Sequence, residues 1–339
     1  MLCALPVADA ENVEDLVGRV LGSDRASDTT LLLELAALLE SIAEHASRVR
    51  VQEKVLEIKE REFGPDHAHV AGALTNLGSA YGSLGDNAKR RDLLERALAI
   101  REREYGRDHV QVAIALKNLG NAYGSLGGTA KRRRDLLERA LAIEEREYGR
   151  DHIKVASTLV FLGDTYGDRG DYAKARDVLE RALAINEREY GRDHVAVAVT
   201  LTNLGVARGS LGDNGKKRDL LERALAIFER ALGRDHVQVA HTLNRLGTAH
   251  GDLGDAAKKR ELVERALAIQ EREYGRDHLK VAYTLMNLGN AYGDLGDAAK
   301  ARELLERALA IFEREYGRDH PKTAYCAARL EKNAQQLLC

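Results

Sequence analysis

Pairs of aspartate and histidine recur along the sequence, and both residue types are suited to metal binding or acid–base catalysis. Successive pairs are 42 residues apart, with one interval of 43. If each interval is a helical hairpin, neighbouring pairs lie about 10 Å apart, which is too far for one ion whose ligands lie within about 2.2 Å of it. The spacing therefore favours a structural role, in which the aspartate caps a helix. The pairs begin at Asp66, Asp108, Asp151, Asp193, Asp235, Asp277 and Asp319.

Other signatures of enzyme chemistry are missing from the sequence. We find no glycine-rich phosphate loop, no zinc-binding cysteine spacing and no nucleophile elbow. The three cysteines, Cys3, Cys326 and Cys339, are odd in number and lie near the termini, which suits a reducing compartment better than a disulfide framework. We therefore predict a protein that is not an enzyme and needs neither a cofactor nor a metal.

Charge and hydropathy limit the classes of partner that the protein is expected to bind. Lys plus Arg (52) nearly balances Asp plus Glu (54), so no overall field favours nucleic acid or an anionic membrane. The apolar run from residue 2 to 8 lacks a basic flank and contains Pro6, and no stretch is long enough to span a bilayer. A cytoplasmic location is the expectation.

The 42-residue unit predicts two amphipathic helices, because apolar residues fall at i, i+3, i+4 and i+7 in both halves of it. Gly85 is expected to end the first helix, Asp86 to cap the second, and Gly106 to end the second in a left-handed conformation. Two such helices cannot bury both apolar faces alone, so neighbouring hairpins must stack. The apolar positions of the first unit are Val70, Leu74, Leu77, Tyr81 and Leu84, then Leu93, Leu94, Ala97, Leu98 and Ile100.

These landmarks resemble a known repeat family. Leu77-Gly78, Tyr81, Gly85 and Ala97-Leu98 are similar to the Leu-Gly, Tyr, Gly and Ala positions of the tetratricopeptide repeat (TPR). The longer 42-residue form, with Asp-His in its connector, resembles the repeats of kinesin light chains and nephrocystin-like proteins. The resemblance implies an all-α fold: a right-handed α-solenoid, or superhelix, of stacked antiparallel helix hairpins with a concave face.

The sequence divides into four segments on this basis. Residues 1–28 form an N-terminal extension with room for one short helix, and residues 29–64 read as a degenerate capping repeat. Residues 65–319 hold six tandem repeats of 42–43 residues, and residues 320–339 supply a C-terminal capping helix. The extra residue of the 43-residue unit lies within 127–134, and we expect the glycine turn or a π-bulge to absorb it.

The concave face is where binding is expected, because it carries polar positions of the first helices that neither packing nor capping requires. Asn76, Asn118, Asn203 and Asn287 recur there, and in kinesin light chains asparagines at this position pair with the main chain of a bound peptide. Phe161 and Arg245 interrupt the row. The alternative is that these asparagines are solvated polar residues inherited through duplication. One turn further along are Asn121, Asp164, Thr248 and Asn290, while Lys117, His241, Asn244 and Tyr283 are candidates for specificity.

Arg208 and His250 replace a tyrosine found in four other units, which suggests a distinct polar pocket in the middle of the groove. A terminal carboxylate clamp would need several neighbouring cations. The available cations are Lys117 and either Arg208 or Arg245, and they lie in repeats that are too far apart to form such a clamp.

A basic cluster also opens several second helices, and stacking would align these clusters into a ridge. The long cations Arg90, Arg133, Lys217 and Lys259 stand where two units have alanine, and each is expected to extend its charge to solvent. The ridge could bind an anion, a phospholipid or a nucleic acid, although aromatic residues for base stacking are missing. The clusters are Lys89 to Arg91, Lys131 to Arg134, Lys216 to Arg218 and Lys258 to Arg260.

The leading interpretation is a scaffold or adaptor that binds an extended peptide or a partner helix in the groove.

Overall fold

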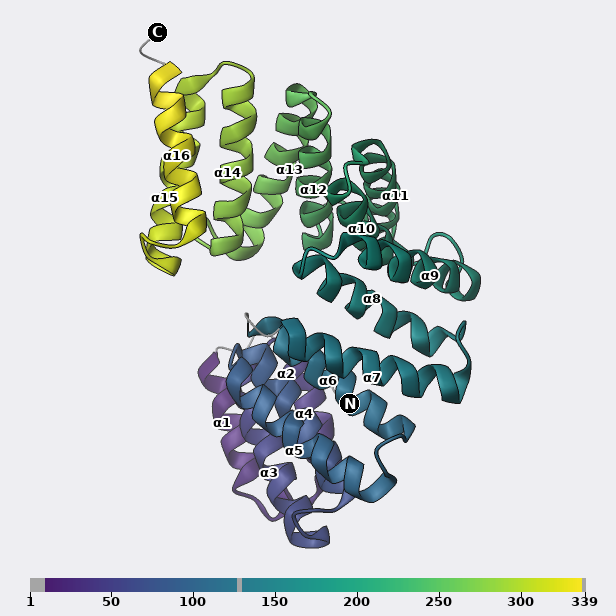
Figure 1. The fold of residues 1–339 in the computed structure, drawn as a ribbon. Coiled ribbons are helices and arrows are strands. Elements are labelled where there is room, and N and C mark those ends of the chain that lie inside the picture. Colours follow the sequence, from purple (N-terminus) through teal and green to yellow (C-terminus); the bar gives the residue numbers. More distant parts are fainter. Residues whose placement is uncertain (1–9, 127–129, 337–339) are drawn as a thin grey trace. The chain divides into compact units, whose positions relative to one another are not determined.

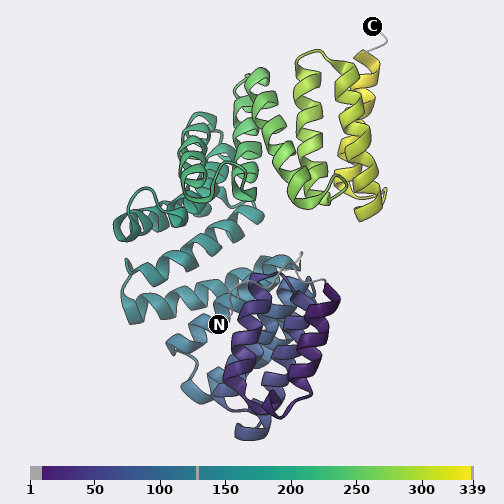
Figure 2. The same cartoon turned by 180° about the vertical axis from the view of Figure 1, so that it is seen from behind.

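The computed structural model describes residues 10–126 and 130–336, and these residues form sixteen α-helices, one 3-10 turn and no strand (Figures 1 and 2). They divide into two compact units, residues 1–169 and 170–339, with helices α1–α8 in the first unit and α9–α16 in the second. The expected all-α class is confirmed. Within each unit, consecutive helices pack side by side as hairpins.

The first unit begins with α1 (Ala10–Leu21) and the 3-10 turn η1 (Asp24–Ser27), which precede the hairpin of α2 and α3. Two further hairpins follow, α4 with α5 and α6 with α7, and α8 then packs on α7. Their bounds are α2 (Thr29–Ser41), α3 (His45–Phe63), α4 (Ala68–Leu84), α5 (Asn87–Tyr105), α6 (Val110–Ser125), α7 (Ala130–Tyr148) and α8 (Ile153–Asp168).

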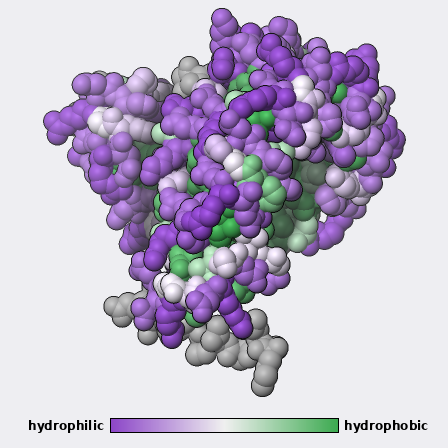
Figure 3. Space-filling model, turned by 90° about the horizontal axis from the view of Figure 1, so that it is seen from below, coloured by the Kyte–Doolittle hydropathy of each residue, from purple (hydrophilic) through white to green (hydrophobic). Residues whose placement is uncertain are grey.

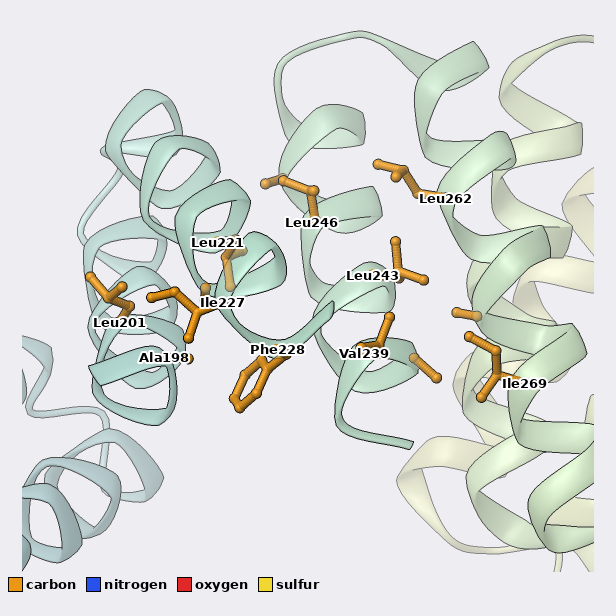
Figure 4. Close-up of a cluster of buried hydrophobic side chains, with 14 of the residues drawn as sticks. Ala198, Leu201, Leu221, Ile227, Phe228, Val239, Leu243, Leu246, Leu262 and Ile269 are labelled. Atoms are coloured by element: carbon orange, nitrogen blue, oxygen red, sulfur yellow. The ribbon is translucent and has the colours of Figure 1, made fainter. Parts of the chain in front are cut away.

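The second unit contains α9, three hairpins and a last helix that packs on α15. Its core is continuous from one hairpin to the next. Figure 4 shows Leu201, Phe228, Leu243 and Ile269 of four successive helices pointing into one hydrophobic cluster. Burial of that cluster holds neighbouring hairpins together, since neither can bury its apolar face alone. The bounds are α9 (Tyr172–Tyr190), α10 (Val195–Ser210), α11 (Asn214–Leu232), α12 (Val237–Asp252), α13 (Ala256–Tyr274), α14 (Leu279–Asp294), α15 (Ala298–Tyr316) and α16 (Pro321–Gln336).

From α4 onward, the start of each first helix is capped by histidine, so the prediction that Asp66 and its equivalents are the caps is wrong. In α10, the backbone N–H of Ala196 donates to His194 Nδ1 at 3.1 Å, and the imidazole stacks on Tyr190 with ring centroids 4.4 Å apart. The ring nitrogen replaces the oxygen of an ordinary cap, and stacking on the preceding helix fixes the ring. At Asp66, Asp108, Asp193 and Asp235 the aspartate instead makes an ion pair with the next second helix, as Asp193 does with Arg230 at 2.9 Å.

The same cap is built at His67, His109, His152, His194, His236, His278 and His320, where the distance from Nδ1 to the donating nitrogen is 3.1–3.2 Å.

The helix ends agree with the sequence except at Gly106. Gly85 ends α4 in the left-handed region (φ 91°, ψ −4°), and Asp86 Oδ1 accepts from the N–H of Lys89 at 3.0 Å, as expected. Gly106 has φ 82° but ψ 154°, so it is not left-handed helical. Its positive φ still favours glycine, and the extended ψ turns the chain toward the next hairpin.

The inserted residue is not absorbed by a π-bulge. Helix α7 has 19 residues, all α-helical, the same length as α5 and α9. The glycine turn, residues 127–129, lies outside the described residues.

Three of the long cations that stand where two repeats have alanine (the small-residue position), Arg133, Lys217 and Lys259, do not extend their charge to solvent, so for them the expectation is wrong. The side chain of Arg133 is only 7% exposed, and its guanidinium lies between Asp164 (2.7 Å) and Asp168 (3.0 Å) of α8. Lys217 and Lys259 reach the equivalent aspartates of the following first helices. The cation therefore joins one hairpin to the next, because a carboxylate is offered there in place of water.

Candidate functional site

The candidate residues all lie on first helices: α4, α6 and α8 in the first unit and α10, α12 and α14 in the second. The side-chain amides of four asparagines, Asn76, Asn118, Asn121 and Asn203, make no hydrogen bond to any other described residue. Their side chains are exposed or half-buried, so each amide has a donor and an acceptor open to a ligand.

Lys117 is committed to an internal ion pair. Its Nζ lies 2.6 Å from Oε1 of Glu144, whose side chain is 2% exposed, and the hydroxyl of Thr158 donates to the other oxygen at 2.5 Å. The ammonium satisfies a carboxylate that would otherwise be buried without a counter-charge. Lys117 therefore joins α6, α7 and α8 and is not a free cation of the groove.

Asp164 is also tied to the protein through Arg133. Asp168, which shares that guanidinium, has its pKa raised by burial and by the nearby Asp164, while Arg133 acts in the opposite direction. The two carboxylates share one cation, so Arg133 neutralises only part of their combined negative charge at this edge of α8.

In the second unit, Asn244 and Asn287 belong to one hydrogen-bonded chain. Asn287 Nδ2 donates to Asn244 Oδ1 at 2.8 Å, and Asn244 Nδ2 donates to the hydroxyl of Thr284 at 2.7 Å. Thr284 donates in turn to Gln270 Oε1 at 2.6 Å inside the core. The structure thus brings two predicted residues together and uses much of their hydrogen-bonding capacity to join α12, α13 and α14.

A pocket of about 290 Å³ lies between α10 and α12. Its lining includes three predicted residues, Asn203, His241 and Arg245. Burial lowers the pKa of His241, and the positive charges of Lys280 and Arg245 lower it further, so the imidazole favours its neutral form. The remaining lining residues are Val199, Thr202, Phe228, Gln238 and Thr242.

Arg208 and His250 take over the contact of the tyrosines that they replace. Tyr166, for example, donates its hydroxyl to Glu138 of the preceding second helix at 2.7 Å. Arg208 pairs with the equivalent Glu180, and His250 Nε2 lies 3.8 Å from the equivalent Glu222. Both side chains are therefore directed at the preceding second helix and hold neighbouring repeats of the second unit together.

The last helix covers the end of the predicted row. Asn290 is 7% exposed and its Oδ1 accepts from Arg329 Nε of α16 at 2.6 Å. The hydroxyl of Tyr283 lies 2.9 Å from that of Tyr316, and Lys322 Nζ lies above the Tyr283 ring at 5.5 Å. Burial first, then the hydrogen bond to Tyr316, raise the pKa of Tyr283 to about 12. These two residues pack against the chain's own C-terminal helix.

Much of the basic ridge is paired with neighbouring carboxylates. Arg91 lies 2.6 Å from Asp92, Arg134 lies 2.6 Å from Asp135, and Lys258 lies 2.8 Å from Glu261. Figure 3 shows hydrophilic residues over most of the surface seen from below, with hydrophobic residues emerging only between them. The pairing of these ridge cations with carboxylates reduces the excess positive charge that binding of a polyanion would need.

Sequence reasoning missed the residue that follows the Ala-Ile of each second helix. This position is Arg101, Glu144, Asn186, Phe228, Gln270 and Phe312 in successive hairpins. It supplies the partner of Lys117, the lining of the pocket in α10–α12 and the end of the Asn287 chain. The available signal was its variability among otherwise near-identical units.

No group of three or more His, Cys, Asp or Glu side chains suited to a metal ion occurs among the residues that the structure describes. None of the helices within those same ranges is long and apolar enough to cross a bilayer.

Comparison with known proteins agrees with this architecture. Two profiles of the same description, Tetratricopeptide repeat, match most of the chain. One matches residues 70–131, 134–188, 168–216, 253–314 and 281–337, and the other matches residues 29–69 and 197–238. None of the curated proteins matches the sequence significantly.

Solved structures of TPR proteins share the fold. BtubC (BKLC) from P. vanneervenii is 24% identical, with a TM-score of 0.56 over 69% of this chain and 94% of its own. A TPR protein from Parabacteroides merdae is 13% identical, with a TM-score of 0.58 over 90% of this chain and 98% of its own.

A crystallised protein of Podosopora anserina, described as a kinesin light chain with nearly identical TPR-like repeats, is 23% identical to this chain. Its TM-score is 0.51, over 61% of this chain and 98% of its own. The family profiles, the 42-residue period and the stacked helix hairpins lead to one conclusion: this chain belongs to the tetratricopeptide repeat family.

Proposed function

We propose that the protein is an interaction scaffold that binds an extended peptide segment of a protein partner on the faces formed by its first helices. Arrays of stacked hairpins present extended binding surfaces of this kind, and such arrays are typically scaffolds and not enzymes. The peptide is held by polar side chains that the fold itself does not use.

One observation carries this proposal: the pocket between α10 and α12 combines an apolar wall with open polar groups. Phe228, 2% exposed, and the aliphatic Val199 provide the apolar part, while the amide of Asn203 has no partner among the described residues. A side chain of a peptide could enter the pocket while its main chain pairs with Asn203 and Gln238.

Selection of binding peptides tests the proposal. Peptides selected from a random display library against the full chain are expected to lose at least about tenfold in affinity for Asn203→Ala with Gln238→Ala, since each lost hydrogen bond costs about 0.5–1.5 kcal/mol. The control is Lys258→Ala, on the exposed side of α13. Peptides that bind all three proteins equally would exclude this face as the binding site.

Binding to the basic ridge is a weaker candidate, because the ridge cations have internal partners. We also propose that residues 29–64 act as the N-terminal capping repeat, residues 65–319 as the tandem array and residues 320–339 as the C-terminal cap. Helix α16 supports the last assignment, since it packs on α15 and encloses Asn290.

A further inference from the structure

The cation at the small-residue position is matched to a residue 35 positions later in the sequence. Lys217 is matched by Asp252 and Lys259 by Asp294, while Ala175 is matched by Ser210. Each of these two lysines is thus paired with a carboxylate, and the alanine is matched by a hydroxyl. Arg48, at the same position of the first hairpin, is matched by Ser83 but takes its carboxylate from Glu40 at 3.0 Å. The rule reflects the cost of placing a half-buried charge without a counter-charge.

Arg90 in the first unit breaks this rule, because the residue 35 positions later is Ser125. The side chain of Arg90 lies against Gly82, where an added Cβ would be 2.8 Å from its Cδ. Its Nε is enclosed by protein and has no hydrogen-bond partner among the described residues. Burial lowers the pKa of Arg90, which marks a guanidinium that lacks a compensating anion.

Arg101, in the second half of α5, also lacks a compensating anion. Its Nη1 is buried without a hydrogen-bond partner, and none of the described residues makes an ion pair with it. Burial lowers the pKa of Arg101 as well, and Tyr105 acts in the opposite direction. The two residues that correspond to Lys117 and Thr158 around Glu144 are here the uncharged Thr75 and Ala115.

The neighbouring first helices cannot supply the missing charge. Helices α4 and α6 contain no aspartate or glutamate, whereas α8, α12 and α14 each carry at least one aspartate. Arg90 and Arg101 are 11 residues apart on α5, which places them on one face about 16 Å apart at 1.5 Å per residue. An extended chain covers that distance in about five residues.

We propose that the face of α4, α5 and α6 in the first unit binds an acidic peptide segment, with Arg90 and Arg101 each receiving one carboxylate. This inference rests on the proposed scaffold function and specifies the chemistry of its partner at a second place. The amides of Asn76 and Asn118, which have no partner among the described residues, lie on α4 and α6 and can pair with the peptide main chain.

The probe is an acetylated and amidated decapeptide of serine with glutamate at positions 3 and 8, titrated calorimetrically into the full chain. It is expected to bind more tightly than the same peptide with both glutamates replaced by glutamine, and than one with glutamates at positions 3 and 4. Arg90→Gln and Arg101→Gln should each weaken binding about tenfold, because each removes a charge-assisted hydrogen bond. The matched control is Arg91→Gln, whose guanidinium already pairs with Asp92.

A second variant tests the idea without removing an arginine. Ser125→Asp supplies the carboxylate that the rule requires, so it should raise the unfolding midpoint and weaken binding of the decapeptide about tenfold, whereas Ser125→Asn should do neither. Equal binding of the two-glutamate and two-glutamine peptides, or unchanged binding by Ser125→Asp and both arginine variants, would overturn the inference. The scaffold proposal is judged separately, by the library peptides and the α10–α12 variants.

Discussion

Lys217 Nζ lies 2.8 Å from Asp252 Oδ2, and the stem of the lysine passes directly over Gly209 on its way to that carboxylate. The ion pair joins α11 to α12, while the glycine on α10 leaves room for the stem. One contact therefore explains three residues, the cation, the aspartate and the glycine.

Two glycine substitutions separate packing from helix propensity. At Gly209 an added Cβ would lie 2.3 Å from Lys217 Cδ, whereas at Gly167, where Ala175 replaces the cation, nothing lies within 4 Å. Gly167→Ala should therefore stabilise the protein by about 0.5–1 kcal/mol, and Gly209→Ala should give no gain or a loss. Urea midpoints measure both. Failure of Lys217→Ala to restore the expected gain in the Gly209→Ala background would contradict the packing explanation.

The histidine caps can be tested at His194. Asn in place of His194 keeps a side-chain acceptor for the N–H of Ala196, whereas Leu keeps bulk against Tyr190 but accepts nothing. We expect His194→Leu to cost about 0.5–2 kcal/mol and His194→Asn clearly less. Thermal and urea unfolding measure the difference, and equal losses would assign the role of His194 to stacking alone.

The pair of Lys117 and Glu144 should be costly to break and cheap to replace. Lys117→Met leaves a carboxylate buried with only the hydroxyl of Thr158 as a partner, so it should destabilise by about 3–5 kcal/mol. The double variant with Glu144→Phe copies the apolar residue Phe228 of another hairpin and should recover most of that loss. A double-mutant cycle in urea checks this. Additive losses would mean that the two side chains do not interact.

His241 should make the second unit less stable in mild acid. Its pKa in the folded protein lies below 6.5, chiefly through burial, so the unfolded chain binds the proton more readily. The stabilising contribution is complete above pH 6.5 and is lost as the pH falls through the lower folded value. NMR titration of the imidazole measures that value directly. His241→Gln should remove this part of the pH dependence of unfolding, and a midpoint above 6.5 would contradict the burial argument.

The period of 42 residues was enough to predict the hairpins, because each unit repeats the same apolar pattern and the same glycines. It was also enough to place Asn76, Asn118 and Asn203 on first helices, where their amides are open. The contacts between neighbouring hairpins could not be predicted from the period. The engagement of Arg208 with Glu180 and of Asn290 with Arg329 depends on how one hairpin rests on the next.

The caps show a different limit of sequence reasoning. Aspartate is the more common cap, so Asp-His was read with the aspartate in that role. Only coordinates show that the imidazole of His194 is held by Tyr190 and can therefore serve as the acceptor, which leaves Asp193 to pair with Arg230. The variable position at Arg101 was visible in the sequence, but its enclosure between first helices was not.

The residue after each Ala-Ile constrains how such a gene can change length. Loss of one 42-residue segment, from Glu144 to Ile185, would leave Lys117 opposite Asn186, with an ammonium enclosed beside an amide that cannot neutralise it. Recombination that removes this segment is therefore expected to yield a shortened protein of lower stability. Contacts between neighbouring hairpins, such as that of Lys117 with Glu144, therefore restrict which hairpin can follow which, even though the hairpins share most of their sequence.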